Sequence, residues 1–188
     1  MRKIIIIILV LLFSTVAESH PLVNTKYTYY AVAPTSLHDI LSSLNSATPV
    51  WENGEPFHAY TDSFVQRGFR WKTKNGYCSI FNVNVTVDIT FTLPKLGAGP
   101  SAVKNIWHNW YPNVLRHENN HKGHAIAIAK DIERGIASLP KEKNCDSLER
   151  NANTLGYRLL ERLRQLDKSY DQRTNHGETE GAWVYTHL

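Results

Sequence analysis

The alternation of apolar and polar residues at positions 77–93 constrains the fold of this chain more than any other feature. Most odd positions are apolar, and every even position from 82 to 92 is Asn, Thr or Asp. A period of two predicts a long strand with one buried and one wet face. Asn75-Gly76 precedes this strand, and Asn-Gly supplies the positive φ angles of a two-residue hairpin turn. Residues 65–71 alternate less cleanly, and with the turn between the two runs we expect an antiparallel hairpin.

The second half of the chain has the period of helices instead. One apolar pattern runs to residue 139 and is interrupted or kinked at Pro112, while a second covers residues 146–168. The short connection between them makes the two helices antiparallel. We therefore expect an α+β fold, in which an N-terminal antiparallel β-sheet with a long hairpin packs on C-terminal antiparallel helices. Residues 20–188 are expected to form a single domain.

The first 19 residues have the composition of a secretory signal peptide. A basic start, Arg2-Lys3, precedes ten apolar residues, and small residues stand at positions 17 and 19. Because a bilayer core needs about 20 apolar residues, no stable membrane anchor is expected. The predicted location after cleavage is the periplasm or the extracellular space.

The chain has two cysteines, Cys78 and Cys145. Export and an even count favour a disulfide between them. A bridge that closes a loop of about 67 residues would stabilise the fold by on the order of 4 kcal/mol in the chain-entropy model. Neither cysteine has a Cys or His partner at zinc-ligand spacing, which argues against a Cys/His zinc site.

The segment His117-Glu118-Asn119-Asn120-His121 carries the main functional signal. Residues i and i+4 lie one above the other on a helix, so the two imidazoles can bind one metal ion. Glu118 then lies beside that ion as a general base, which is the arrangement of zinc hydrolases. The pattern predicts one Zn²⁺ ion, with His117 and His121 as ligands.

A catalytic zinc usually has three protein ligands and an open position for water. The two C-terminal helices are similar in length, so the tail after the second one should return beside His117, and His176 is the preferred third ligand. His124 is an alternative, but about 10.5 Å of helix rise separates it from His117. Asp171 is another, either as a ligand or as a hydrogen-bond acceptor for a ligand imidazole.

The proposed hydrolysis also needs a donor for the oxyanion, and Tyr170 and Tyr185 are the candidates. The predicted substrate is a peptide or protein. A nucleic-acid surface is not expected, because the net charge is only +4 and no run of five like charges occurs. The oligomeric state stays open. The alternative function is a non-catalytic binding protein of the cell envelope with a structural or vestigial metal site.

The motif, Trp110, the two cysteines and the tail around His176-Gly177 together resemble a known family. It is the bacterial DUF922-type family, described as predicted secreted zinc-dependent proteases, and the similarity covers nearly all of the chain after the signal peptide. The resemblance implies export, a metallopeptidase-like site and a periplasmic or extracellular setting. It implies no known substrate. The positions that match the family's motifs are His117, Glu118, His121 and His176.

Overall fold

The computed structural model describes residues 20–188, so the predicted signal peptide lies outside the described residues. The chain first forms β1 (Leu22–Val32), α1 (Ile40–Ala47) and a small hairpin of β2 (Val50–Glu52) and β3 (Glu55–Phe57). The long strands β4 (Tyr60–Lys74) and β5 (Tyr77–Leu96) follow, and then the helices α2 (Ser101–Ala137) and α3 (Cys145–Thr174). Two short 3₁₀ turns, Glu178–Glu180 and Val184–His187, form the tail.

The predicted hairpin is confirmed. β4 and β5 pair in antiparallel register from Tyr60↔Thr92 to Lys74↔Tyr77, and the turn residues Asn75 and Gly76 have φ angles of 54° and 73°. The sheet as a whole is mixed rather than antiparallel, because β1 pairs with β5 in parallel. Alternation could not distinguish the two, since side chains alternate between faces in either kind of pair.

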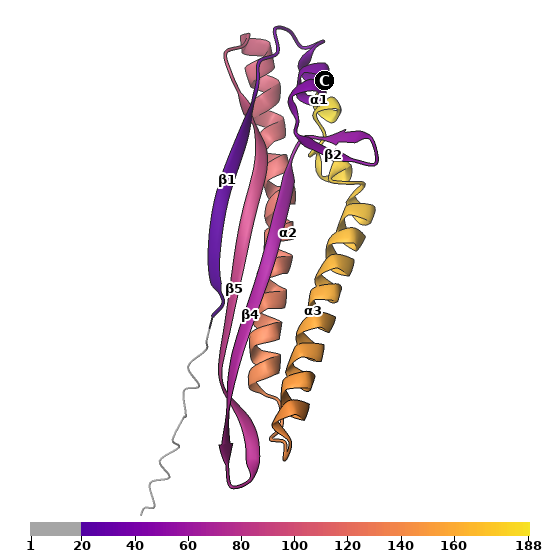
Figure 1. Ribbon diagram of the computed structural model, residues 1–188. Helices are drawn as coiled ribbons and strands as arrows, with labels where there is room; N and C mark the ends of the chain where they lie inside the picture. The colour runs from indigo at the N-terminus through magenta and orange to yellow at the C-terminus, as the bar shows by residue number, and fades with distance from the viewer. Residues whose placement is uncertain (1–19) are drawn as a thin grey trace, which may run out of the picture.

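One face of the sheet packs against α2, and α3 runs antiparallel to α2 beside it (Figure 1). The apolar residues of β5 at positions 85–93 are buried against one side of α2, which explains the strict alternation in the sequence. The α+β class and the helix pair are therefore as predicted. None of the helices described here is both long and apolar enough to cross a bilayer.

The α2 helix continues through Pro112, where the sequence suggested an interruption or a kink. Proline inside a helix costs about 3 kcal/mol, because it removes one hydrogen bond and crowds the preceding turn. Trp110 and Val114 flank it, and both are buried in the core. Burial of these side chains offsets the local cost, since each is worth about 2 kcal/mol or more.

The α3 helix is longer than predicted and ends at Thr174 rather than near residue 168. Asn175 follows it in the left-handed conformation, with φ of 48°, and its backbone N–H bonds to the last turn. The extra turns place Asp171 on the helix itself, facing α2. At the opposite end of α3, the predicted disulfide between Cys78 and Cys145 is formed and joins β5 to the helix.

Candidate metal centre

Three side chains from two helices meet at one point. His117 and His121 lie one turn apart on α2, and Asp171 reaches them from the last turn of α3. The Nε2 atoms of the two histidines are 3.4 Å apart, and Asp171 Oδ1 lies 3.3 Å from the first and 3.1 Å from the second. Ligands about 2.0–2.1 Å from a tetrahedral zinc ion lie about 3.3 Å from one another. The three atoms therefore have the spacing of three ligands around one such ion.

Both imidazoles are oriented by carboxylates on their other nitrogen. His117 Nδ1 lies 2.9 Å from Glu180 Oε2, and His121 Nδ1 lies 3.0 Å from Asp167 Oδ1. These contacts place the proton on Nδ1 and leave Nε2 free to bind a cation. The sequence did not identify Glu180 or Asp167. Asp167 lies one helical turn before Asp171. This i, i+4 spacing was the only feature of the sequence that could have pointed to Asp167.

The electrostatics of the cluster favour a cation. Burial would raise the pKa of the Asp171 carboxyl, but hydrogen bonds from His117 and His121 hold it well below its usual range. Burial lowers the pKa of His121, but the carboxylates of Asp167 and Asp171 outweigh this and raise it to about 10. Protons on the imidazoles and a divalent cation compete for the same negative charge. The donor set therefore suits one divalent ion of the zinc type.

Tyr170 packs on the His117 imidazole and bonds to the carboxylate that orients it. Its ring stacks on the His117 imidazole at a centroid distance of 4.8 Å, and its hydroxyl donates to Glu180 Oε2 over 2.7 Å. The same hydroxyl accepts a hydrogen bond from Asn120 Nδ2 at 2.7 Å. Tyr170 is thus engaged with the carboxylate that orients His117. Tyr185, the other predicted oxyanion donor, gives its hydroxyl to Glu178.

Glu118 lies on the strand side of the same cluster. Its side chain is buried, and Thr61 on β4 donates a hydrogen bond to Glu118 Oε2 at 2.6 Å. Burial raises the pKa of the Glu118 carboxyl, and the hydrogen bond from Thr61 opposes this only in part. A carboxyl with a raised pKa is a better proton acceptor and donor near neutral pH.

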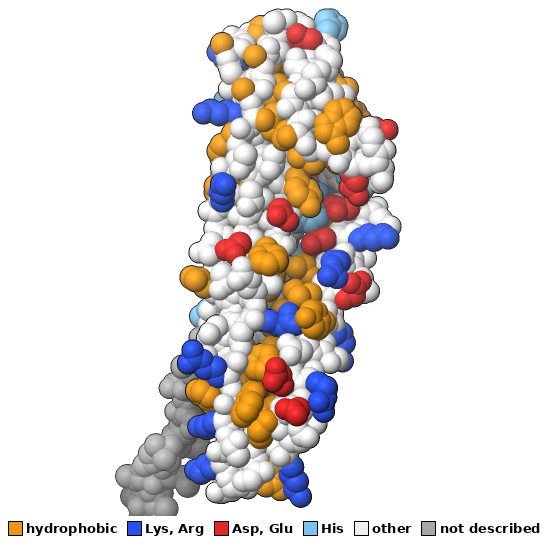
Figure 2. Space-filling view, in the orientation of Figure 1, with side chains coloured by type: hydrophobic (Ala, Val, Ile, Leu, Met, Phe, Trp, Pro, Cys, Tyr) orange, Lys and Arg blue, Asp and Glu red, His pale blue; other side chains and the backbone are white. Residues whose placement is uncertain are grey.

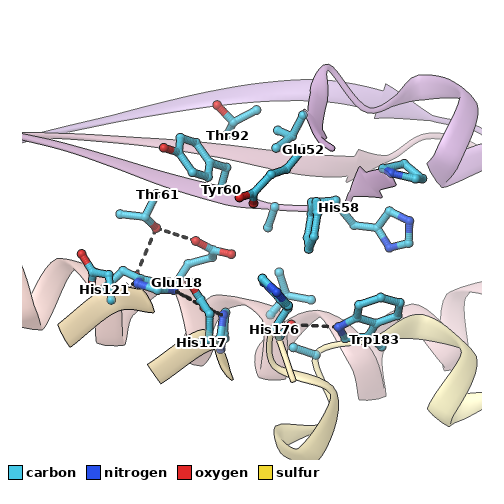
Figure 3. A pocket seen from close by; sticks show the side chains of 18 of the residues that line it. Glu52, His58, Tyr60, Thr61, Thr92, His117, Glu118, His121, His176 and Trp183 are labelled. Atoms are coloured by element: carbon cyan, nitrogen blue, oxygen red, sulfur yellow. Dashed lines mark hydrogen bonds and ion pairs between the residues drawn. The ribbon is translucent and has the colours of Figure 1, made fainter. Parts of the chain in front are cut away.

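A cleft of about 970 Å³ between β4, the β2–β3 hairpin and the two helices is lined by His117, His121, Asp171, Glu118 and Thr61. Figure 3 shows Glu118, His117 and His121 on its helical floor, with Tyr60, Thr61 and Thr92 on the strand side. The space-filling view shows acidic side chains around the hollow, and the carboxylates that line the cleft include Glu52, Asp167 and Asp171 (Figure 2). The candidate metal centre is therefore open to a substrate.

His176 lies in the cleft but not in the group of three ligand atoms. Its ring packs on Phe57, at a centroid distance of 5.0 Å. Because α3 continues past residue 168, Asp171 takes the place beside the histidines, and His176 falls beyond the helix end. His124 Nδ1 instead contacts Asp167 Oδ1 at 2.8 Å, so it supports the carboxylate that orients His121. His121, His124 and Asp167 also form a second group with ligand-like spacing.

A protein-family profile described as "Bacterial protein of unknown function (DUF922)" matches residues 27–177. This range includes most of the sheet, both long helices, His117, His121, Asp167 and Asp171, and it ends just before Glu180. No curated protein matches the chain. No solved structure matches it either. Since the profile covers most of its length, the chain belongs to the bacterial DUF922 family.

Proposed function

We propose that this protein is an exported zinc-dependent peptidase in which Glu118 is the general base. The observation that carries the proposal is the triangle of His117, His121 and Asp171, with Glu118 beside it in an open cleft. These residues would hold a zinc ion, which would supply Lewis-acid polarisation of a substrate carbonyl and a lowered pKa of water. Three protein ligands leave a fourth position for that chemistry, as in catalytic rather than structural zinc sites.

Asp171 is the third ligand in this proposal, in place of His176. Its Oδ1 contacts the Nε2 atoms of both histidines, whereas the His176 ring is absent from the group. Two histidines and one carboxylate form a recognised ligand set of catalytic zinc sites. The ligand carboxylate comes from α3, so the ion would join the two long helices.

Glu118 performs the proton transfers. Its carboxylate takes a proton from the water that attacks the peptide carbonyl, and then delivers it to the departing amine. Burial keeps its pKa raised, which suits both steps. Thr61 holds one carboxylate oxygen through its hydroxyl and thereby fixes the direction of the other.

Export is part of the proposal. The formed disulfide between Cys78 and Cys145 supports an oxidising compartment, either the periplasm or the extracellular space. The open cleft and its adjoining strands suit a peptide or an unfolded protein segment as substrate.

The experiment compares the zinc-loaded wild type with Glu118→Gln on a library of unstructured peptides, with mass spectrometry as the readout. Wild type should cleave some of them. Glu118→Gln should retain one zinc ion per chain but lose about 10²–10⁴-fold in kcat, since Gln cannot accept the proton. Glu161→Gln is the matched control, because Glu161 is exposed on α3 and away from the cleft. Equal turnover by Glu118→Gln and wild type would rule out the general-base role.

A wild type that binds zinc tightly and cleaves no member of the library would favour the alternative. The chain would then be a cell-envelope binding protein with a structural metal site.

A further inference from the structure

The tail after α3 holds His176 in an unusual backbone conformation. Asn175 and His176 have φ angles of 48° and 50°, and Gly177 follows with 85°. Consecutive left-handed residues other than glycine are uncommon, and each costs on the order of 1–3 kcal/mol when poorly accommodated. Such conformations persist only where the surrounding contacts enforce them, and they cluster at functional sites.

Contacts from several elements enforce the position of His176. Its backbone N–H donates to the Asp171 carbonyl at 2.7 Å, and its own carbonyl accepts from Trp183 Nε1 at 2.8 Å. The next residue, Gly177, lies directly against the metal-site histidine. A Cβ placed on Gly177 would come within 3.1 Å of His117 Cγ and within 2.8 Å of Ala182 Cβ. The backbone at residue 176 is therefore fixed relative to the metal centre.

The imidazole of His176 has no hydrogen bond from the described residues, although its backbone is fully bonded. One side of the ring packs on Phe57 of β3, and the side chain is otherwise exposed in the cleft. Figure 3 shows it rising from the tail into the cleft, beside His117 and opposite the strand wall. A ring N–H without a protein acceptor is available to a substrate atom.

We infer that His176 is a catalytic residue that donates a hydrogen bond from its ring N–H to the substrate's carbonyl oxygen as negative charge develops there. The inference rests on the proposed peptidase function and concerns the oxyanion donor of that reaction. No proton needs to be transferred, because imidazole offers an N–H in both its neutral and its charged form. A donor that is already oriented at the developing charge stabilises the transition state more than the ground state.

Other donors near the cleft are already engaged or less well fixed. The hydroxyls of Tyr170 and Tyr185 are bonded to Glu180 and Glu178, and the Trp183 indole N–H is bonded to the His176 carbonyl. His58 Nε2 is bonded to Asn45 at 2.7 Å. The remaining competitors that line the cleft are the Tyr60 hydroxyl on the strand wall and the exposed side chains of Lys168 and Gln172 on α3.

The test uses His176→Asn, because asparagine also tolerates positive φ but cannot place a donor as far into the cleft. The expected loss is about 10²–10³-fold in kcat, the usual effect of removing one oxyanion donor. Zinc stoichiometry and zinc affinity should not change. Calorimetric affinity for a phosphinic peptide, whose tetrahedral group carries a charged oxygen, should fall with kcat. His108→Asn, exposed on α2, is the control.

His176→Gly repeats the measurement with a residue that accepts the backbone angle without strain, and thermal unfolding tests whether both variants are folded. Loss of zinc in either variant would make His176 a ligand and overturn the inference. Unchanged kcat and unchanged phosphinic-peptide affinity would also overturn it, as would a loss seen only in Tyr60→Phe. An inactive wild type would instead overturn the peptidase proposal itself.

Discussion

At the scale of single residues, the carboxylates that contact the Nδ1 atoms of the two histidines are as important for the site as the proposed ligands. Asp167 Oδ1 lies 3.0 Å from His121 Nδ1 and 2.8 Å from His124 Nδ1, so one oxygen contacts two imidazoles. Its side chain is about one quarter exposed. Asp167 therefore orients the imidazole of His121, which is a proposed zinc ligand.

We predict that Asp167→Asn lowers zinc affinity about 10–100-fold, the usual effect of losing an outer-shell partner of a ligand histidine. An amide retains the shape of the side chain but carries no charge to stabilise the His121 N–H. Competition titration with a chelator measures the affinity, and Glu161→Gln on the same helix is the control. Affinity equal to wild type in Asp167→Asn would show that His121 is oriented by other contacts.

The sequence predicted the residues of the site that lie within one turn of helix. His117, Glu118 and His121 follow from helical spacing alone, because their relative positions are fixed by the local backbone. Asp171 was one of three open possibilities, and Glu180 was not identified. Both meet the histidines only through the packing of α3 and the tail, which no local pattern specifies.

At the scale of secondary structure, the two ends of α3 contact different parts of the molecule. Its N-terminal residue, Cys145, is bonded to β5, while Asp171 in its last turn meets the metal-site histidines. The two residues are about 39 Å apart along the helix. The α3 helix is thus attached covalently to β5 at its N-terminal end and contacts the histidines of α2 at its C-terminal end.

We predict that the double substitution Cys78→Ala/Cys145→Ala lowers the free energy of unfolding by roughly 2–4 kcal/mol, because the unfolded chain regains the freedom of a long loop. Zinc affinity should stay unchanged, since the bridge is far from the site. Urea unfolding and chelator competition measure the two quantities. If zinc affinity fell together with stability, the two ends of α3 would not be independent.

The elements themselves were largely predictable. The alternation in residues 77–93 and the Asn75-Gly76 turn predicted the hairpin, and the antiparallel pairing confirms it. The parallel pairing of β1 was missed because strand direction depends on the path of the intervening chain. The end of α3 was missed because residues 170–174 are mainly polar, and the left-handed Asn175 rather than an apolar pattern ends the helix.

At the scale of the whole molecule, the proposed ion would be the link between the two long helices. The sheet packs against α2, while Asp171 and Asp167 reach the site from α3. The proposed activity therefore depends on one divalent ion shared by the two helices. The Asp171 carboxylate also contacts both imidazoles directly.

Equilibrium zinc binding by wild type, Asp171→Asn and His176→Asn tests this claim most directly. Wild type should bind one ion per chain. Asp171→Asn should lose more than about 100-fold in affinity, beyond the range expected for an outer-shell partner, while His176→Asn should bind as wild type does. Retained affinity in Asp171→Asn, or a loss confined to His176→Asn, would contradict the account.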